Sequence, residues 1–359
     1  MKNITTTLLI CALATLGGGA SVLAAEKQPA VKRAAAQTQA KQTQRKQTAA
    51  QANKTGKPAA KSAARASRPA AQSARQAPRS QRLVAANPGQ AQARKVGAAA
   101  EDWTSGNPAL GSASVLVVDQ HSGAPLLEKN ANVVVPIASI SKLMTAMVVL
   151  DAGLDLNEVI TITDEDVDYL KGTRSRLQVG SAMTRDTALL LALMSSENRA
   201  ANALGRHYPG GLRAFVAAMN RKAWSLGMTH THFEEPTGLS ANNVSTARDL
   251  ARMVAAAHQY PKIREYSTMA EARVDLGHRV LDFTNTNALV KNPEWQIGLS
   301  KTGYISEAGR CLVMQTWVAD KPVVMVLLDS NGKMTRVGDA NRIKRWMESA
   351  GVGFKNTGA

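Results

Sequence analysis

Residues 136–151, PIASISKLMTAMVVLD, place two serines directly before a lysine, where the pattern indicates that a helix begins. Almost every residue after Lys142 is apolar and the run ends at Gly153, so this helix should be buried on all sides in the centre of a domain. Residues three apart share a face of a helix, whereas neighbours diverge by about 100°. Ser139 therefore shares a face with Lys142, and Ser141 does not.

A lysine can activate a neighbouring serine only when its amine is uncharged and within hydrogen-bonding reach. Burial lowers the pKa of a lysine, and so does a second cation nearby. The beginning of a helix adds free backbone N–H groups and a field that favours developing negative charge. If the pair is reactive, Ser139 is the nucleophile, Lys142 is its base and Ser141 is structural.

The segments on both sides of this stretch predict the fold class. Strand-like runs lie at 112–130 and again at 298–305 and 309–331, the last with a long hairpin around residues 319–322. Helical segments mixed with loops lie between them. A short helix closes the folded part. Strands at both ends with helices between them favour one α+β unit whose sheet combines N- and C-terminal strands.

Short polar motifs arise by chance, so Ser-x-x-Lys alone is a weak pattern. It recurs at residues 330–333; Ser-x-Asn occurs at 105–107, 196–198 and 240–242; Lys-Thr-Gly occurs at 54–56 and 301–303. In one combination, each of the three motifs lies in a folded part of the chain and in a definite structural context. Residues 139–142 open a buried helix, 196–198 lie between helical segments, and 301–303 lie on a late strand.

This order of motifs resembles the penicillin-binding serine acyl-transferases, which carry S-x-x-K, S-D-N and K-T-G. The resemblance extends to SLGMTHTHFEEPTGLSANNVSTARDLA and NTNALVKNPEWQIGLSKTGYISEAGRCLVM, and covers residues 110–345. These stretches are most similar to the low-molecular-mass D-alanyl-D-alanine endopeptidases of the penicillin-binding protein 7 type. The resemblance implies a β-lactamase/transpeptidase-like α+β fold, with an antiparallel sheet flanked by helices and a mostly helical subregion.

The resemblance also implies the chemistry. Ser139 would attack the carbonyl of the penultimate D-alanine of a peptidoglycan stem peptide and form an acyl-enzyme, while Lys142 takes its proton. Ser196 would relay a proton toward the leaving nitrogen. The backbone N–H groups of Ser139 and Tyr304 would form the oxyanion hole. β-Lactam antibiotics would be covalent inhibitors, and no metal or cofactor is expected.

The other motif residues would hold the substrate. Asn198 would bind the peptide amide. Lys301 would supply the second cation that keeps Lys142 uncharged, and would help Thr302 to receive a substrate carboxylate. Gly303 would let an extended substrate add to the edge of the strand.

Two peptidase activities fit this set of motifs, because a D-Ala–diaminopimelate cross-link and a terminal D-Ala-D-Ala both present a free carboxylate beside the scissile nitrogen. The endopeptidase interpretation rests on the resemblance, and a D-alanyl-D-alanine carboxypeptidase is the alternative. A serine β-lactamase is disfavoured because no convincing base for deacylation is found. An inert cell-wall-binding protein is disfavoured because every required side chain is present. Glu197 stands where the general motif has aspartate, a position at which the family tolerates variation. The 56 residues from 304 to 359 are too few for the extra β-rich domain and membrane helix of carboxypeptidase relatives.

Residues 1–24 have the order of a secretory signal peptide, with Lys2, an apolar run and small residues ending at Ala24. The apolar run is too short and too interrupted by glycine for a membrane anchor. Cys11 follows Ile10, which does not suit a lipoprotein site. We therefore expect export and a soluble periplasmic protein.

Residues 25–105 form a basic arm rich in Ala, Gln and Lys, which we expect to be disordered because it has little apolar surface to bury. Residues 26–100 contain 16 Lys and Arg and one acid, whereas residues 101–359 contain 27 basic and 26 acidic residues. Residues 26–100 have no aromatics to stack bases, so no nucleic acid is expected. A solvated tether is the simplest interpretation, and a weak attraction to anionic envelope polymers is the alternative. The peptidase domain should span 106–350, followed by a tail at 351–359.

Three further features predict structure more readily than chemistry. Cys311 remains alone once the signal peptide is removed, so no disulfide within the chain is expected and it should behave as a small buried hydrophobe. His230 and His232 lack a third ligand at zinc-like spacing. Glu234 and Glu235 precede Pro-Thr-Gly and should flank a turn rather than form a glycosidase pair.

Overall fold

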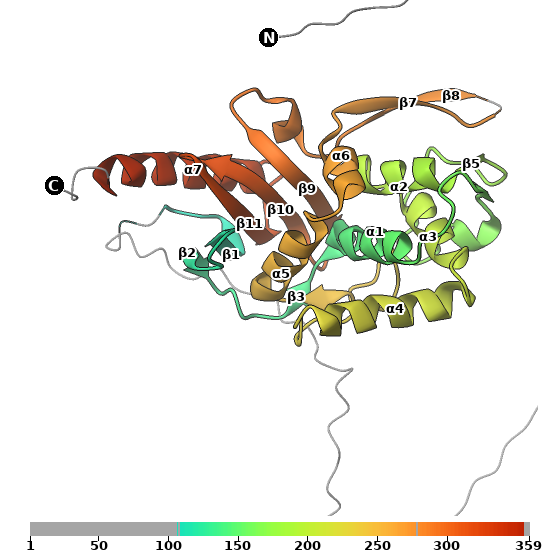
Figure 1. Ribbon diagram of the computed structural model, residues 1–359, viewed down its shortest axis with the longest axis horizontal. Coiled ribbons are helices and arrows are strands. Elements are labelled where there is room, and N and C mark those ends of the chain that lie inside the picture. The colour runs from blue at the N-terminus through green and yellow to red at the C-terminus, as the bar shows by residue number, and fades with distance from the viewer. Residues whose placement is uncertain (1–105, 107, 278, 355–359) are drawn as a thin grey trace, which may run out of the picture. The chain divides into compact units, whose positions relative to one another are not determined.

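A five-stranded antiparallel sheet forms one half of the fold. The computed structural model describes residues 106, 108–277 and 279–354, so the expected signal peptide, the basic arm and residues 355–359 lie outside the described residues. The strand order is β2-β1-β11-β10-β9, which pairs the first strands of the folded part with the last (Figure 1). These strands are β1 (Ser112–Asp119), β2 (Pro125–Lys129), β9 (Gln296–Ile305), β10 (Gly309–Val318) and β11 (Lys321–Ser330). The expected α+β class is confirmed.

Helices cover both faces of this sheet, which explains the nearly continuous apolar run of β11. Helix α7 (Thr335–Phe354) packs on one face and α5 (Ala247–Ala257) on the other. Side chains alternate along a strand. Val324, Val326 and Leu328 therefore join the core on the α5 side, and Val323, Met325 and Leu327 join the core on the α7 side.

A two-residue turn joins β10 to β11, within the hairpin expected around residues 319–322 but shorter than that range, because Lys321 and Pro322 already belong to β11. Val318 pairs with Lys321, and the two residues between them, Ala319 and Asp320, have φ values of 48° and 60°. Positive φ at both central positions defines the type I′ turn that suits the twist of a hairpin.

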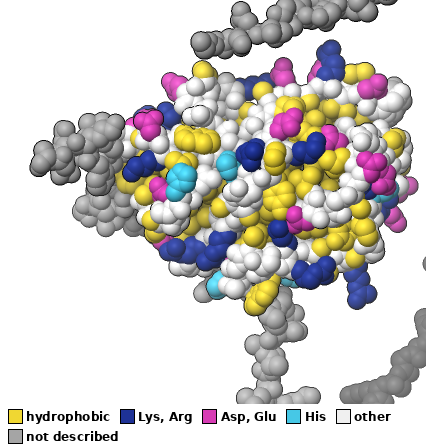
Figure 2. Space-filling model, in the orientation of Figure 1, with side chains coloured by type: hydrophobic (Ala, Val, Ile, Leu, Met, Phe, Trp, Pro, Cys, Tyr) yellow, Lys and Arg dark blue, Asp and Glu magenta, His cyan; other side chains and the backbone are white. Residues whose placement is uncertain are grey.

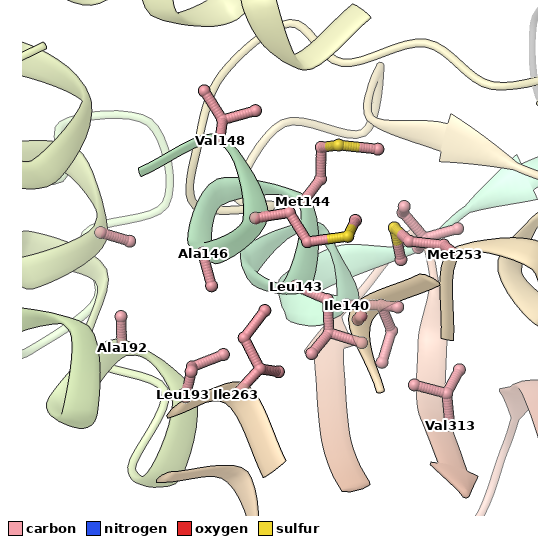
Figure 3. Packing of buried hydrophobic residues seen from close by; sticks show 14 of the residues in the cluster. Ile140, Leu143, Met144, Ala146, Val148, Ala192, Leu193, Met253, Ile263 and Val313 are labelled. Atoms are coloured by element: carbon pink, nitrogen blue, oxygen red, sulfur yellow. The ribbon is translucent and has the colours of Figure 1, made fainter. Parts of the chain in front are cut away.

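Helix α1 (Lys142–Asp151) lies at the centre of the second half of the fold, which is mostly helical (Figure 1). It is enclosed by α5 and by α2 (Arg185–Met194), α3 (Asn198–Arg206), α4 (Gly211–Ser225) and α6 (Pro261–Thr268). Figure 3 shows Leu143 and Met144 of α1 among side chains from α2, α5, α6 and β10. Enclosure on every side is the physical reason for its all-round apolar sequence.

Short elements connect these layers. They are β3 (Val135–Pro136), β4 (Val159–Thr161), β5 (Ala182–Thr184), β6 (Val244–Ser245), β7 (Glu271–Asp275), β8 (Val280–Thr284) and the 3₁₀ turns η2 (Ala138–Ser141), η3 (Asp164–Asp166) and η4 (Ala288–Lys291). The sequence patterns do not predict the β7–β8 hairpin. The backbone of α7 continues through residues 351–354, where a tail is expected. No helix in the described part of the chain has the length and apolarity needed to cross a bilayer.

Candidate active site

The two serines of the opening stretch lie in η2, which leads directly into α1. The hydroxyl Oγ of Ser139 lies 2.9 Å from Nζ of Lys142. Ser141 faces the other way: its buried hydroxyl donates to the Ala138 carbonyl at 2.9 Å and accepts from the side-chain amide of Asn243 at 2.9 Å. The structure therefore brings together the pair that the spacing predicts and gives Ser141 only structural contacts.

Two glycines hold the backbone around Ser139. Ala138 has a φ of 49°, in the left-handed region that alanine rarely adopts. A Cβ on Gly238 would lie 1.9 Å from the Ala138 carbonyl oxygen and 2.7 Å from the Ser139 nitrogen, and a Cβ on Gly303 would lie 3.1 Å from that nitrogen. Gly303 thus has a packing reason to be glycine besides the expected approach of substrate, which stays a prediction. The sequence analysis missed Gly238, although this glycine lies in the EEPTGL stretch that was expected to form a turn.

Lys142 is fully buried, and burial lowers the pKa of its amine to about 7. The carboxylates of Glu235 and Glu197 act against this shift because they favour the charged form. Burial is the cause that lowers the pKa of Lys142, and the charge of Lys142 in turn helps to lower the pKa of Lys301; the expected role of Lys301 in keeping this amine uncharged stays a prediction. The main physical premise of the Ser139 and Lys142 pair, that burial lowers the pKa of the amine, therefore holds.

Three oxygen atoms surround Nζ of Lys142, an arrangement that suits an ammonium ion and equally allows an uncharged amine to act as a base. Besides Ser139, its Nζ lies 2.7 Å from Oδ1 of Asn198 and 2.6 Å from the carbonyl oxygen of Thr237. An uncharged amine has two N–H donors and one lone pair. Donation to Asn198 and Thr237 leaves the lone pair for the Ser139 hydroxyl, which is the arrangement a base requires.

Ser196 and Asn198 lie where α2 passes into α3. Asn198 is the first residue of α3, and its Nδ2 donates to Oγ1 of Thr173 at 3.1 Å. Its amide is thus shared between Lys142 and a neighbouring loop, and the expected contact with a substrate amide stays a prediction. Ser196 has a left-handed φ of 62°. Its hydroxyl makes no hydrogen bond with the described residues, so its expected proton relay also stays a prediction.

Lys301 and Thr302 lie on β9, and both are buried. Burial, followed by the nearby charges of Lys142 and Arg336, holds the pKa of Lys301 well below its ordinary value. Its amine donates to the Thr302 carbonyl at 3.1 Å. The Thr302 hydroxyl donates to Oγ1 of the exposed Thr286 at 2.7 Å, so it already faces the outer side of the strand.

β9 is the edge strand of the sheet, so one side of its backbone is free of β10. On that side the N–H of Ser300 donates to Oγ of Ser267 at 3.3 Å. Tyr304 lies four residues further along a regular register, so its N–H points the same way. The backbone nitrogen of Ser139 lies beside this edge, against Gly303. The two N–H groups expected to form an oxyanion hole therefore belong to neighbouring segments.

Comparison with known proteins agrees with this geometry. The sequence profile of the D-alanyl-D-alanine carboxypeptidase family, peptidase family S11, matches residues 101–332. The chain belongs to this family of serine peptidases. Its membership confirms the expected low-molecular-mass penicillin-binding peptidase, and the β-lactamase/transpeptidase-like fold is confirmed by solved structures.

Individual relatives are similar over most of their length. A D-alanyl-D-alanine endopeptidase of Pseudomonas aeruginosa is 53% identical over 245 residues, covering 68% of this chain and 79% of the relative. One of Escherichia coli is 47% identical over 275 residues, covering 76% and 88%. The Streptomyces K15 DD-transpeptidase structure matches with a TM-score of 0.63 and 27% identity, covering 67% of this chain and 98% of its own.

The sequence analysis missed a third cation near β9 of this peptidase. Arg336 of α7 donates to the carbonyl oxygens of Gly303 at 3.0 Å and Cys311 at 3.1 Å. It thereby fixes the strand that carries the Lys-Thr-Gly motif from the sheet face opposite the helical half. Glu197, the departure from the aspartate of the general motif, accepts from Ser175 at 2.7 Å and Arg176 at 3.2 Å.

The weaker candidates of the sequence have structural places in this peptidase. Ser330, the serine of the second S-x-x-K motif, forms a buried hydrogen bond of 2.7 Å between its Oγ and Oγ of Ser112 inside the sheet. No cluster of three metal-ligating side chains exists among the residues described, and the backbone of His230 is tied to Asp249. Cys311 is buried and unpaired, and burial raises the pKa of its thiol to about 11.

The surface of the folded part mixes both signs of charge. Figure 2 shows basic and acidic side chains interspersed over the face in view. This pattern agrees with the 27 basic and 26 acidic residues from residue 101 onward. The excess positive charge of the chain lies in residues before the described part.

Proposed function

We propose that this serine DD-peptidase hydrolyses D-alanyl–diaminopimelate cross-links of peptidoglycan through an acyl-enzyme on Ser139. One observation carries the proposal: a fully buried lysine amine, with its pKa lowered to about 7, lies 2.9 Å from a serine hydroxyl. A serine is a weak nucleophile unless such a base takes its proton.

In the proposed acylation, the lone pair of Lys142 takes the hydroxyl proton while Oγ of Ser139 attacks the carbonyl carbon of the penultimate D-alanine. The negative charge that develops on the carbonyl oxygen is held by the backbone N–H groups of Ser139 and Tyr304. The proton then moves from Lys142, through the Ser196 hydroxyl, to the leaving nitrogen. Water later cleaves the ester and restores Ser139.

The substrate carboxylate beside the scissile nitrogen needs a cationic receptor. Lys301 and Thr302 supply an amine and a hydroxyl on the outer side of β9, and Arg336 adds charge through the same strand. Binding of a carboxylate next to Lys301 would favour its protonated form, because an opposite charge at short range raises the pKa of a lysine. Asn198 and the open edge of β9 would align the peptide.

The choice of endopeptidase follows the relatives. Relatives named D-alanyl-D-alanine endopeptidase are 53%, 47% and 36% identical, whereas relatives named D-alanyl-D-alanine carboxypeptidase are 27–34% identical. The carboxypeptidase alternative uses the same residues. We also propose that residues 1–24 direct export to the periplasm, that 25–105 tether the domain at 106–350, and that β-lactams acylate Ser139.

Digestion of purified cross-linked muropeptides, followed by mass spectrometry, tests this function. The wild type should convert dimers to monomers, and Ser139→Ala should not. Loss of a single terminal alanine without loss of dimers would instead establish the carboxypeptidase. Labelled penicillin should bind covalently to the wild type alone; equal labelling of Ser139→Ala would remove Ser139 from its role, and rapid turnover of the drug would establish a β-lactamase.

A further inference from the structure

The turn that follows the second of two neighbouring glutamates is organised by one carboxylate. Oε2 of Glu235 accepts from the backbone N–H and the hydroxyl of Thr237, each at 2.6 Å. Its Oε1 accepts from the N–H of Gly238 at 2.6 Å and of Ser240 at 3.3 Å. Because four donors converge on two oxygens, an ionised carboxylate is the side chain that satisfies them all.

This turn contacts the reactive pair at two consecutive residues. The carbonyl of Thr237 accepts from Nζ of Lys142 at 2.6 Å. The backbone of Gly238 packs so closely on η2 that a Cβ there would lie 2.7 Å from the Ser139 nitrogen. A rotation of the turn would therefore misdirect the amine and release the backbone of the nucleophile together.

We propose that Glu235 is a positioning residue for acylation: its carboxylate orients the amine of Lys142 through the carbonyl of Thr237. Through Gly238, the same carboxylate braces the backbone of Ser139. With Asn198 holding the second N–H of the amine, the lone pair is directed at the nucleophile. This inference rests on the proposed function of Ser139.

Glu235 also acts on Lys142 through its charge, and this gives the proposal a distinctive readout. The charged groups around the amine are Glu235 from the turn, Glu197 from the start of α3 and Lys301 from β9. Both carboxylates favour the protonated amine. The acylation rate should rise with pH along an acid limb and then reach an alkaline plateau. Loss of the Glu235 charge should move the acid limb to lower pH, and loss of the Glu235 hydrogen bonds should lower the rate on the plateau.

The test compares second-order rates of acylation by a fluorescent penicillin between pH 5.5 and 9, with the full chain. Glu235→Gln keeps the size of the side chain but replaces one acceptor oxygen with a donor. We expect its plateau rate to fall about tenfold or more, and its acid limb to move about 1 pH unit lower. Glu235→Asp keeps the charge at a shorter reach, so its limb should stay in place while its plateau falls.

Glu234→Gln is the matched control. Glu234 is the adjacent carboxylate, but it accepts from the side chains of Ser240 and Asn242 and does not affect the pKa of Lys142. Its plateau and limb should match the wild type.

Two results would overturn the proposal. The first is a Glu235→Gln variant whose plateau rate of acylation equals that of the wild type. The second is a Glu235→Gln variant with a lower plateau rate but an unmoved acid limb, together with an equal loss of rate in Glu234→Gln, which would mean that the turn is purely structural. If Glu235→Gln does not fold, Glu235→Asp decides, since a wild-type plateau would refute positioning. Failure of the proposed function is seen separately, as absent labelling of the wild type or persistent labelling of Ser139→Ala.

Discussion

Replacing Lys142 with methionine tests whether burial keeps the amine uncharged. Methionine has a similar length and no charge. The amine has a pKa of about 7 in the folded protein, against an ordinary value of 10.5. In the unfolded chain it returns to its ordinary value, so unfolding takes up a proton at any pH between these limits. Because the unfolded state binds more protons, the wild type should become more stable as the pH rises through this window.

The size of the effect follows from the shift. Each pH unit inside the window corresponds to about 1.4 kcal/mol. Between pH 7.5 and 9.5 the wild type should gain roughly 2–3 kcal/mol relative to Lys142→Met, which has no titrating group at this position. Below pH 7 the difference should level off. The variant also leaves Asn198 and Thr237 without a donor, which lowers its stability at every pH but does not change the slope.

Urea unfolding followed by circular dichroism at half-unit pH steps measures this difference. Subtracting the two stability curves removes the contribution of groups that titrate in both proteins. Lys321→Met, at the exposed start of β11, is the control and should differ from the wild type by a constant. Parallel curves for the wild type and Lys142→Met would refute the argument that burial depresses the pKa of this amine.

Three further predictions follow from the site. Acylation of the wild type by labelled penicillin should rise about tenfold between pH 6 and 8, because the uncharged fraction of an amine with pKa near 7 rises from about one tenth to about nine tenths; a flat profile would exclude Lys142 as the base. Gly238→Ala should lose at least about 2 kcal/mol of stability and most of its acylation, since its Cβ meets the Ala138 carbonyl and its φ of 81° is strained for alanine; wild-type denaturation and labelling would contradict this. Iodoacetamide at pH 8 should leave Cys311 unmodified in the native protein and modify it in urea, as read by peptide mass spectrometry; equal modification in both would show that the thiol is accessible.

The reactive pair could be predicted because its geometry is local. Ser139 and Lys142 are three residues apart where η2 leads into α1, so spacing alone selects Ser139 over Ser141. Chain order and context then sufficed to choose residues 196–198 and 301–303 from their decoys. The apolar run of α1 likewise predicted a helix that is enclosed on all sides.

The rest of the site depends on long-range contacts that leave no periodic pattern. Thr237 contributes a backbone carbonyl, and any residue type has one. Arg336 reaches β9 from a helix that begins 32 residues beyond Gly303. Burial, a property of the whole fold, is the cause that lowers the pKa of Lys142, and the role assigned to Lys301 stays a prediction. The β7–β8 hairpin escaped prediction because its strands are only five residues long and carry several charges, although Val274 and Phe283 give it a buried apolar face.

The enclosure of α1 sets the order in which this protein acquires reactivity. Its burial needs α2, α3, α4, α5 and α6 in place, and η2, which leads into it, packs against β9 and β10, which are among the last strands to be synthesised. An incomplete chain carries an ordinary ammonium ion beside an inert alcohol, so it is harmless to any peptide it meets. Only folded molecules should therefore be acylated by a β-lactam. The stoichiometry of labelling in a preparation then measures the fraction of molecules that has folded.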